Sequence, residues 1–185
     1  MVAQEHNTAP KRSLPGVDRW YTPPEVLKDP IEICCRSQVT SLELASLWRR
    51  LKHEFTWDGS LRDLYVERTD LEHWQALLEF LRERQYSVSY QRGGQNEPVP
   101  VAAADVFADR EKTHVLSITV DGILLNSHFF SPEEIELDID PREIHDNSRF
   151  ATLCHFMCEL SKCLRRDILL THENLKGAQI LVFRA

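Results

Sequence analysis

The stretch EIELDID, residues 134–140, alternates acidic and aliphatic side chains at every position, and no other feature of the sequence constrains the fold as strongly. Successive side chains of a β-strand point to opposite faces, so this period of two predicts a strand with one apolar face and one acidic face. A helix would keep Ile135 with Ile139 but would turn Leu137 to the far side. A strand is therefore favoured, although SPEE at residues 131–134 would suit a helix start. We call residues 134–140 the acidic strand.

Size and composition indicate one globular domain. The chain has 185 residues, of which 42% are apolar and 28% charged, ordinary values for a protein with a single core. Residues 1–30 hold five of the nine prolines, so we expect an irregular N-terminal arm followed by a single α+β domain over 31–185. No segment approaches the roughly 18 consecutive apolar residues of a membrane helix, and no secretion signal is visible, so we expect a cytoplasmic protein without a membrane span.

The first half of the domain alternates predicted strands with predicted helices. Strands are expected at IEICC, LRDLYVE and YSVSYQ. Each intervening helix is expected to open with a threonine and a glutamate three residues later, Thr40 with Glu43 and Thr69 with Glu72. Their buried faces are expected to carry Leu44, Leu47, Trp48, Leu51 and Phe55 in the first helix and Leu71, Trp74, Leu78 and Leu81 in the second. Right-handed crossovers are expected wherever successive strands pair in parallel, and ferredoxin-like wiring is one option.

The second half begins with a hairpin. HVLSITV, Asp121-Gly122 and ILLNSHFF predict two strands joined by a type I′ turn, with Leu116, Ile118, Val120, Ile123 and Leu125 inward and Ser117, Thr119, Asn126 and His128 on the opposite face. Residues 93–113 are compatible with a surface loop or with a short helix around residues 101–107. After the acidic strand we expect a helix over 148–164, with Phe150, Leu153, Met157, Leu160 and Leu164 inward, and the strands DILLT and QILVF. The predicted class is α+β, a single mixed sheet with about three helices packed on it.

Negative charge is concentrated around the acidic strand. The formal net charge is −7, and residues 131–147 carry seven acids against one base, whereas residues 148–185 carry a net charge of +3. A surface that binds nucleic acid would need a basic stripe with stacking aromatic residues, so we expect no nucleic-acid partner. Like charges on one short face repel one another, and a basic protein would relieve that repulsion and be attracted at long range.

The same carboxylates allow a different interpretation, a divalent-metal-dependent phosphoester-cleaving or transferring enzyme. Next neighbours on one face of a strand lie roughly 6.5 to 7 Å apart, close enough for two of them to hold Mg²⁺ or Mn²⁺. The metal ligands would be Glu136, Asp138 and Asp140, and the base would be His128 or His145. However, no lysine follows in a Glu-x-Lys element, and no Gly-Ser stands shortly before the Asp-x-Asp. Alternatively, the acids protect the edge strand of a sheet, and function lies elsewhere in the chain, in residues 93–113 or the N-terminal arm.

The five cysteines are an odd number in a chain without a secretion signal, which predicts reduced thiols. Cys154, His155 and Cys158 lie within about one helical turn and could approach one zinc ion. Structural zinc needs four ligands, and only the distant Cys34 and Cys35 could complete the set. We favour small apolar cysteines packed in a helix, and we expect no cofactor.

The run FMCELSKCLRRDILLTHEN, residues 156–174, resembles an ending found in bacterial immunity-type proteins, which antagonise toxins. That ending consists of a helix, a basic or glycine-containing turn, a short strand and then Thr-x-Glu-Asn. His172 stands where the pattern often has proline. Residues 168–170 suit core-facing strand positions, and Thr171, Glu173 and Asn174 suit the polar end of a strand. The resemblance implies a cytosolic protein that binds a toxin and blocks its active site, with no catalysis of its own.

The sequence thus favours a non-enzymatic protein-interaction module, an immunity-like inhibitor that binds a basic protein partner. The predicted partner-binding residues are the acids of the acidic strand and two that follow it, Glu134, Glu136, Asp138, Asp140, Glu143 and Asp146. The metal-dependent enzyme is the alternative. The two hypotheses differ in geometry, because a metal site needs carboxylates that converge in a pocket, whereas an interface needs them exposed on a flat surface.

Overall fold

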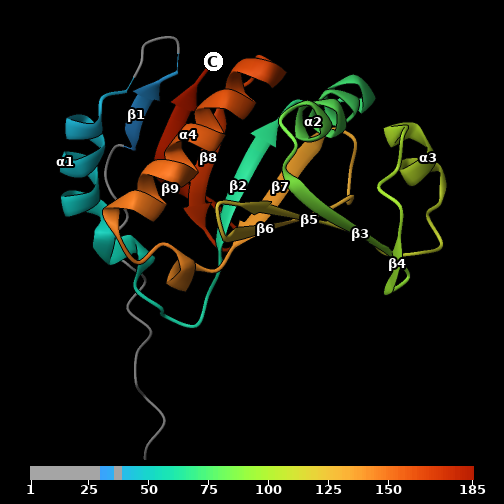
Figure 1. Cartoon of the computed structure of the whole chain (residues 1–185), viewed down its shortest axis with the longest axis horizontal. Helices are drawn as coiled ribbons and strands as arrows, with labels where there is room; N and C mark the ends of the chain where they lie inside the picture. Colours follow the sequence, from blue (N-terminus) through green and yellow to red (C-terminus); the bar gives the residue numbers. More distant parts are fainter. Residues whose placement is uncertain (1–29, 36–38) are drawn as a thin grey trace, which may run out of the picture.

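The computed structural model describes residues 30–35 and 39–185, whose strands form one mixed sheet (Figure 1). The order across the sheet is β1-β9-β8-β2-β7-β6-β5-β3-β4. β1 runs parallel to β9, and every other neighbouring pair is antiparallel. In chain order the strands are β1 Ile31–Cys34, β2 Arg62–Glu67, β3 Ser87–Arg92, β4 Gln95–Glu97, β5 His114–Val120, β6 Ile123–His128, β7 Glu134–Ile139, β8 Ile168–His172 and β9 Leu175–Arg184.

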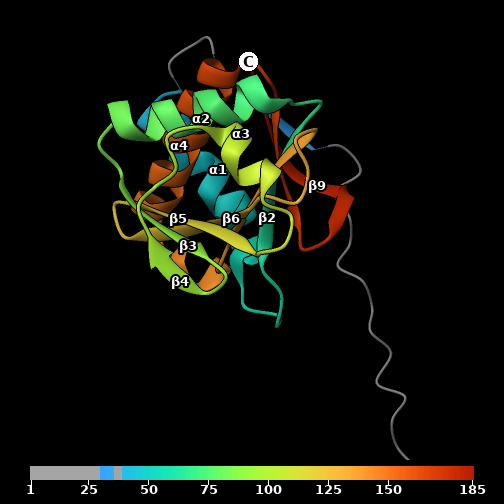
Figure 2. The same ribbon diagram turned by 90° about the vertical axis from the view of Figure 1, so that its right-hand side faces the viewer.

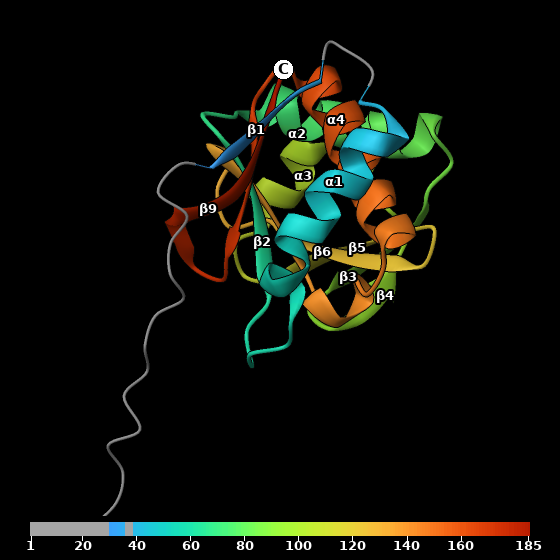
Figure 3. The same cartoon turned by 90° about the vertical axis from the view of Figure 1, so that its left-hand side faces the viewer.

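Three longer helices cover one face of the sheet, which confirms the predicted class. Figure 3 shows α1 and α4 side by side next to β1 and β9, and Figure 2 shows the short α3 beside α2. Two single turns of 3₁₀ helix, η1 and η2, flank the sheet at one end and contact each other. The helical segments are α1 Ser41–Leu51, η1 Lys52–Phe55, α2 Leu71–Glu83, α3 Ala103–Ala108, η2 Pro141–Glu143 and α4 Asn147–Leu164. No helix in the described ranges is long and apolar enough to cross a membrane.

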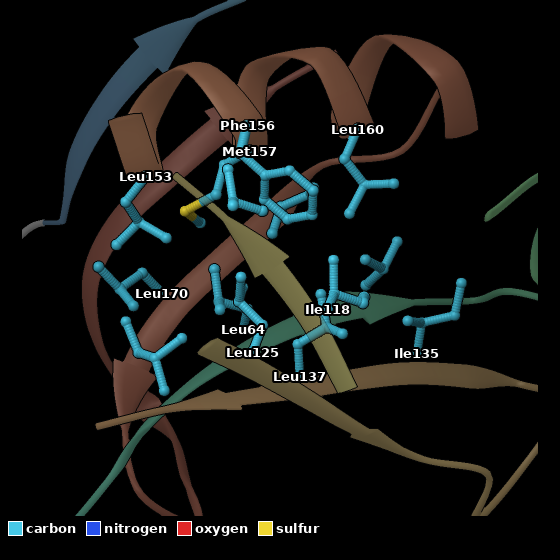
Figure 4. Close-up of a cluster of buried hydrophobic side chains, with 14 of the residues drawn as sticks. Leu64, Ile118, Leu125, Ile135, Leu137, Leu153, Phe156, Met157, Leu160 and Leu170 are labelled. Carbon is cyan, nitrogen blue, oxygen red and sulfur yellow. The ribbon is translucent and has the colours of Figure 1, made fainter. Parts of the chain in front are cut away.

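The acidic strand is β7, and its predicted alternation is confirmed. Ile135, Leu137 and Ile139 are all fully or almost fully buried, at no more than 1% exposed, whereas the acids between them are only partly buried. Figure 4 shows side chains of α4, among them Phe156 and Met157, pointing toward these residues of the sheet. Burial of each such aliphatic side chain is worth about 1.5 to 3 kcal/mol, so the apolar face of β7 fixes which way the strand faces.

The predicted hairpin of β5 and β6 is also confirmed. Asp121 and Gly122 both have positive φ, at 46° and 83°, as the two central residues of a type I′ turn require. The inward residues are those the alternation assigned, since Leu116, Ile118, Val120, Ile123 and Leu125 are all buried. The opposite residues Ser117, Asn126 and His128 lie on the face away from the helices.

The pairing of the first three strands differs from a chain of parallel crossovers. β1, β2 and β3 do not pair with one another, because β9 and β8 lie between β1 and β2, and β7, β6 and β5 lie between β2 and β3. The ferredoxin-like option is therefore wrong. β7 lies in the interior of the sheet between β2 and β6, so the interpretation of the acidic strand as a protected sheet edge is wrong too.

Of the two predicted helix caps, that of α1 is correct and that of α2 is shifted by one residue. Thr40 and Glu43 form the predicted capping box of α1. At α2 the cap is Asp70, whose carboxylate accepts from the backbone N–H groups of Glu72 and His73. Thr69 instead donates its hydroxyl to the carbonyl of Pro132, which anchors the segment before β7. The shift also leaves Leu71 at the surface, 41% exposed, where the sequence predicted an inward position.

The remaining segments settle what the sequence left open. Residues 93–113 contain both β4, joined to β3 through Gly93-Gly94, and the short helix α3. The last predicted strand is longer than QILVF, because β9 spans ten residues and pairs with both β8 and β1. Of the predicted N-terminal arm, residues 1–29 lie outside the described ranges.

The inward position of Leu137 and the outward position of Leu71 can be tested by changing each of them to alanine. Leu137→Ala removes a buried side chain beneath α4 and should lower the free energy of unfolding by about 2 to 5 kcal/mol. Leu71→Ala removes an exposed side chain and should change it by less than about 0.5 kcal/mol. Urea denaturation followed by circular dichroism measures both, and equal losses at the two positions would contradict the assignment.

Candidate functional site

The face of the sheet opposite the helices, which we call the open face, carries a continuous row of polar residues. Ser117, Asn126, Asp138, Asp63 and Thr171 are successive partners in register across β5, β6, β7, β2 and β8. The Ser117 hydroxyl donates to Asn126 Oδ1 at 2.8 Å, and the Asn126 amide donates to Asp138 Oδ1 at 3.2 Å. Neighbouring strands lie about 4.8 Å apart, so the register alone brings these side chains into reach of one another.

Carboxylates gather at the middle of this row, where β2 pairs with β7. We call Asp63, Glu134, Glu136 and Asp138 the carboxylate cluster. Asp63 stands directly opposite Asp138, and Glu67 stands directly opposite Glu134. Like charges directly opposite each other on one face of a sheet destabilise it. The two central strands thus pair against a repulsion on the open face, and the apolar contacts on their other side hold them together.

Tyr65 joins two members of the cluster. Its hydroxyl lies 2.8 Å from Asp63 Oδ2 and 3.3 Å from Glu136 Oε1 and donates toward both. Burial raises the pKa of Tyr65, and its hydrogen bond to Asp63 raises it further, so the phenol stays protonated as a donor. The backbone N–H of Asn174 also donates to Asp63, at 2.7 Å, from the turn between β8 and β9. These two donors satisfy Asp63, which is only 2% exposed.

The ionised forms of two members of the cluster, Asp63 and Glu136, are disfavoured. Burial raises the pKa of Asp63, and the negative charges of Glu173 and Asp138 raise it further, against the opposing effect of its hydrogen bonds. Burial likewise raises the pKa of Glu136, and repulsion from Asp63 adds to the effect. A positive charge placed at this face would favour both ionised carboxylates.

A histidine and an exposed aromatic ring border the cluster. His128 Nε2 lies 3.5 Å from Asp138 Oδ2, and the hydrogen bond with Asp138 raises the pKa of His128 although burial opposes this. The ring of Phe130 stacks on His128, with centroids 5.2 Å apart, and is itself 67% exposed.

One lysine approaches the cluster from the hairpin of β8 and β9. The Lys176 ammonium forms an ion pair with Glu134 and lies 4.7 Å from the centre of the Tyr65 ring. Lys176 is exposed, so this pair is held in water and contributes little to stability. The chain itself therefore shows how a cationic side chain can lie on this face.

The six predicted site residues divide into two groups. Glu134, Glu136 and Asp138 belong to the carboxylate cluster, whereas Asp140, Glu143 and Asp146 lie beyond the end of β7 with local roles. Asp140 accepts from the backbone N–H of Arg142 and pairs with its guanidinium, which lies 4.2 Å over the Trp57 ring. Glu143 accepts from the backbone N–H of Leu124 at 2.6 Å, and Asp146 caps α4.

Sequence reasoning missed Asp63 and Tyr65, which are central to the site. The signal was present, because Asp63, Tyr65 and Glu67 alternate with apolar Leu64 and Val66 in the same period of two. It had no meaning until β2 was known to pair with β7. Phe130 left no comparable signal, because nothing in the sequence distinguishes this exposed residue from its neighbour Phe129, which is buried.

The metal-dependent interpretation finds no matching geometry. Within residues 30–35 and 39–185, no group of three or more His, Cys, Asp or Glu side chains is arranged to hold a metal ion. Of the two alternative bases, His128 lies beside Asp138 on the open face, whereas His145 pairs with Asp146 at the start of α4.

The Thr-x-Glu-Asn ending supports the site structurally. The Thr171 hydroxyl donates to the carbonyl of His172, Glu173 accepts from the backbone N–H of Leu61, and Asn174 adopts a positive φ of 56°. These contacts form the turn that delivers the Asn174 N–H to Asp63. No protein-family model, curated protein or solved structure matches the chain.

The structural role of Asp146 can be separated from its charge. Asp146→Ala removes the acceptor that caps the Arg149 N–H and should lower the free energy of unfolding by about 1 kcal/mol. Asp146→Asn removes the same charge but keeps a capping oxygen, so it should cost only a few tenths of a kcal/mol. Thermal denaturation measures both variants, and an equal loss in the two would show that charge, rather than capping, is what matters at this position.

Glu136→Gln, unlike Asp146→Ala, should raise the stability of the free protein at pH 7. The pKa of Glu136 is higher in the folded state, so the folded protein binds its proton more tightly than the unfolded chain. Stability is therefore lost as the pH rises from the unfolded pKa through the folded one. The denaturation midpoint of Glu136→Gln should exceed that of the wild type at pH 7. The gain should vanish below about pH 4, where Glu136 of the wild type is protonated in the folded and the unfolded state alike. A variant less stable than the wild type at pH 7 would show that burial and repulsion at Glu136 do not destabilise the folded protein.

Proposed function

We propose that this protein is a non-enzymatic interaction module that binds a basic protein partner through the carboxylate cluster on the open face. The observation that carries the proposal is the juxtaposition of like charges on two interior strands, Asp63 opposite Asp138 and Glu67 opposite Glu134. An interior strand has both edges paired, so these acids are not needed to prevent association with another sheet. Their repulsion is a cost to folding that a cationic partner would remove.

The electrostatics favour a partner with several lysine or arginine side chains. Glu136 and Asp138 are only partly buried, and a guanidinium placed between carboxylates can form two charge-assisted hydrogen bonds. The raised pKa of Glu136 means that a nearby cation gains both an attraction and a relief of the repulsion from Asp63. The surrounding negative segment would also accelerate encounter at low salt.

Apolar surface beside the cluster supports a protein as the partner. Phe130 and Leu124 lie at opposite ends of β6, at 67% and 40% exposed, and frame the half-buried Asn126 and His128. Interfaces commonly combine such aromatic anchors with a rim of charged residues, and a small metal ion or free cation would gain nothing from them. The resemblance of residues 156–174 to immunity-type proteins is consistent with a toxin as that partner, one whose basic cleft acts on a polyanion.

The test is affinity capture with two variants of matched charge. Glu134→Gln, Glu136→Gln and Asp138→Asn together remove three charges from the cluster. Glu79→Gln, Glu83→Gln and Glu111→Gln together remove three exposed charges elsewhere, on α2 and after α3. Immobilised wild type and control variant should retain a basic protein, identified by mass spectrometry, that the cluster variant retains at least tenfold less.

Salt and stability measurements make the outcome decisive. Retention should weaken between low and moderate salt, because the attraction is screened. The cluster variant should be at least as stable as the wild type by thermal denaturation, so its loss of binding cannot be ascribed to unfolding. The proposal fails if every retained protein binds the cluster variant and the wild type equally, or if retention requires a divalent cation.

A further inference from the structure

Two buried cysteines from distant parts of the chain meet on the helix side of the sheet. Cys35 follows the last residue of β1, and Cys158 lies in the fourth turn of α4. Their sulfur atoms are 2.6 Å apart although 123 positions separate them in the sequence. A disulfide bond is about 2.05 Å long, so a small movement of either side chain would suffice to form one.

Both side chains are held in position by their surroundings. Cys35 is fully buried, and its backbone N–H donates to the carbonyl of Arg184 at 3.0 Å, which fixes it against the end of β9. Cys158 is 8% exposed and belongs to the buried face of α4. The approach of the two sulfurs therefore follows from the packing of β1 and α4 and needs no rearrangement of the backbone.

One member of the pair, Cys158, borders the surface. Cys158 lines a surface cavity together with Thr40, His155 and Lys162, at the junction of α1 and α4. The hydrogen bond with Cys158 lowers the pKa of Cys35, although burial opposes this, and the positive charge of Lys162 adds to the lowering. The same hydrogen bond, together with burial, raises the pKa of Cys158, so Cys35 carries the thiolate character that makes a pair of cysteines open to oxidants.

We propose that Cys35 and Cys158 form a redox-active pair that closes into a disulfide when a peroxide reaches it through this cavity. Overall, two thiols and one hydrogen peroxide give one disulfide and two water molecules. Cys35 starts as the thiolate, its own proton having passed to water. The Cys158 sulfur passes its proton to Cys35 and attacks the peroxide, so that an S–O bond forms and the O–O bond breaks, and the released hydroxide takes up the proton that Cys35 had lost and leaves as the first water. The Cys35 sulfur then attacks the resulting sulfenic acid, the S–S bond forms, the S–O bond breaks, and the hydroxyl leaves with the Cys35 proton as the second water.

Cys154 does not compete for this role. It lies one helical turn before Cys158 and is only 2% exposed. Burial raises the pKa of Cys154 well above its ordinary value, and the nearby Cys35 raises it further, so it stays a thiol. Its side chain packs as an apolar group in the core, as the sequence predicted for the cysteines of this helix.

The disulfide would tie an edge strand to the central helix. β1 has four residues and, among the strands that the structure describes, pairs with β9, to which an exposed ion pair between Glu32 and Arg184 also joins it. A covalent link from Cys35 to α4 would close a long loop of the chain and restrict the unfolded state. This pair lies on the helix side of the sheet, so the inference stands independently of the carboxylate cluster on the open face.

Peptide mapping of the full-length protein tests the proposal. Reduced protein is treated with hydrogen peroxide, the remaining thiols are alkylated, and the peptides are identified by mass spectrometry. We expect a linked pair of peptides containing Cys35 and Cys158, a mass lower by two hydrogen atoms, and reversal by dithiothreitol. The melting temperature of the oxidised protein should exceed that of the reduced protein by at least about 5 °C.

Three variants define the controls. Cys158→Ala should abolish both the link and the rise in melting temperature, whereas Cys34→Ser and Cys163→Ser should keep both. The mapping of the wild-type protein needs no variant, so the proposal stays testable even if Cys158→Ala does not fold. A peroxide-treated wild type that keeps Cys35 and Cys158 alkylatable, or that links either of them to another cysteine or to a second chain, would overturn the inference.

Discussion

The pairing of β2 with β7 is the interaction on which the rest of the structure depends. On one side of this pair, Leu64 faces Leu137 and Val66 faces Ile135, and α4 packs on them. On the other side, the same register places Asp63 opposite Asp138. Because side chains alternate strictly along a strand, the apolar contacts and the like-charge contacts cannot be adjusted separately. Burial of four large aliphatic side chains outweighs the repulsion, and the molecule keeps a charged face that its own core enforces.

The acids of residues 131–147 illustrate how one run of charge serves two purposes. Asp140, Glu143 and Asp146 each accept hydrogen bonds from backbone N–H groups and so stabilise η2, β6 and α4. Glu136 and Asp138 have no such backbone partners among the described contacts, and their companions are other side chains of the open face. A carboxylate that accepts from backbone amides stabilises the fold, whereas one that faces other carboxylates strains it. This difference is the physical basis for the proposal that Glu136 and Asp138 bind a partner.

The two faces of the sheet therefore carry two separate chemistries. The open face offers carboxylates, a histidine and an exposed aromatic ring, which suit a cationic protein surface. The helix side holds the buried apolar core, and two thiols meet at the edge of that core, beside a cavity and a lysine. The carboxylate cluster and the cysteine pair share no residues, although they lie on opposite sides of the same sheet. Oxidation of the thiols would stiffen the β1 edge without altering the charge of the open face.

The sequence by itself determined the local elements. The period of two in β7, the Asp-Gly turn between β5 and β6, the capping box of Thr40 and the apolar face of α4 each depend on residues close together in the chain, and each was predicted correctly. Only the tertiary structure decided the order of strands, because pairing of β2 with β7 or of β1 with β9 joins segments that no local pattern relates. The same reason hid Asp63 and Tyr65 from the predicted site and Cys35 from Cys158. It also moved the cap of α2, since Thr69 and Asp70 are both able to cap and the contact of Thr69 with Pro132, 63 residues away, decided between them.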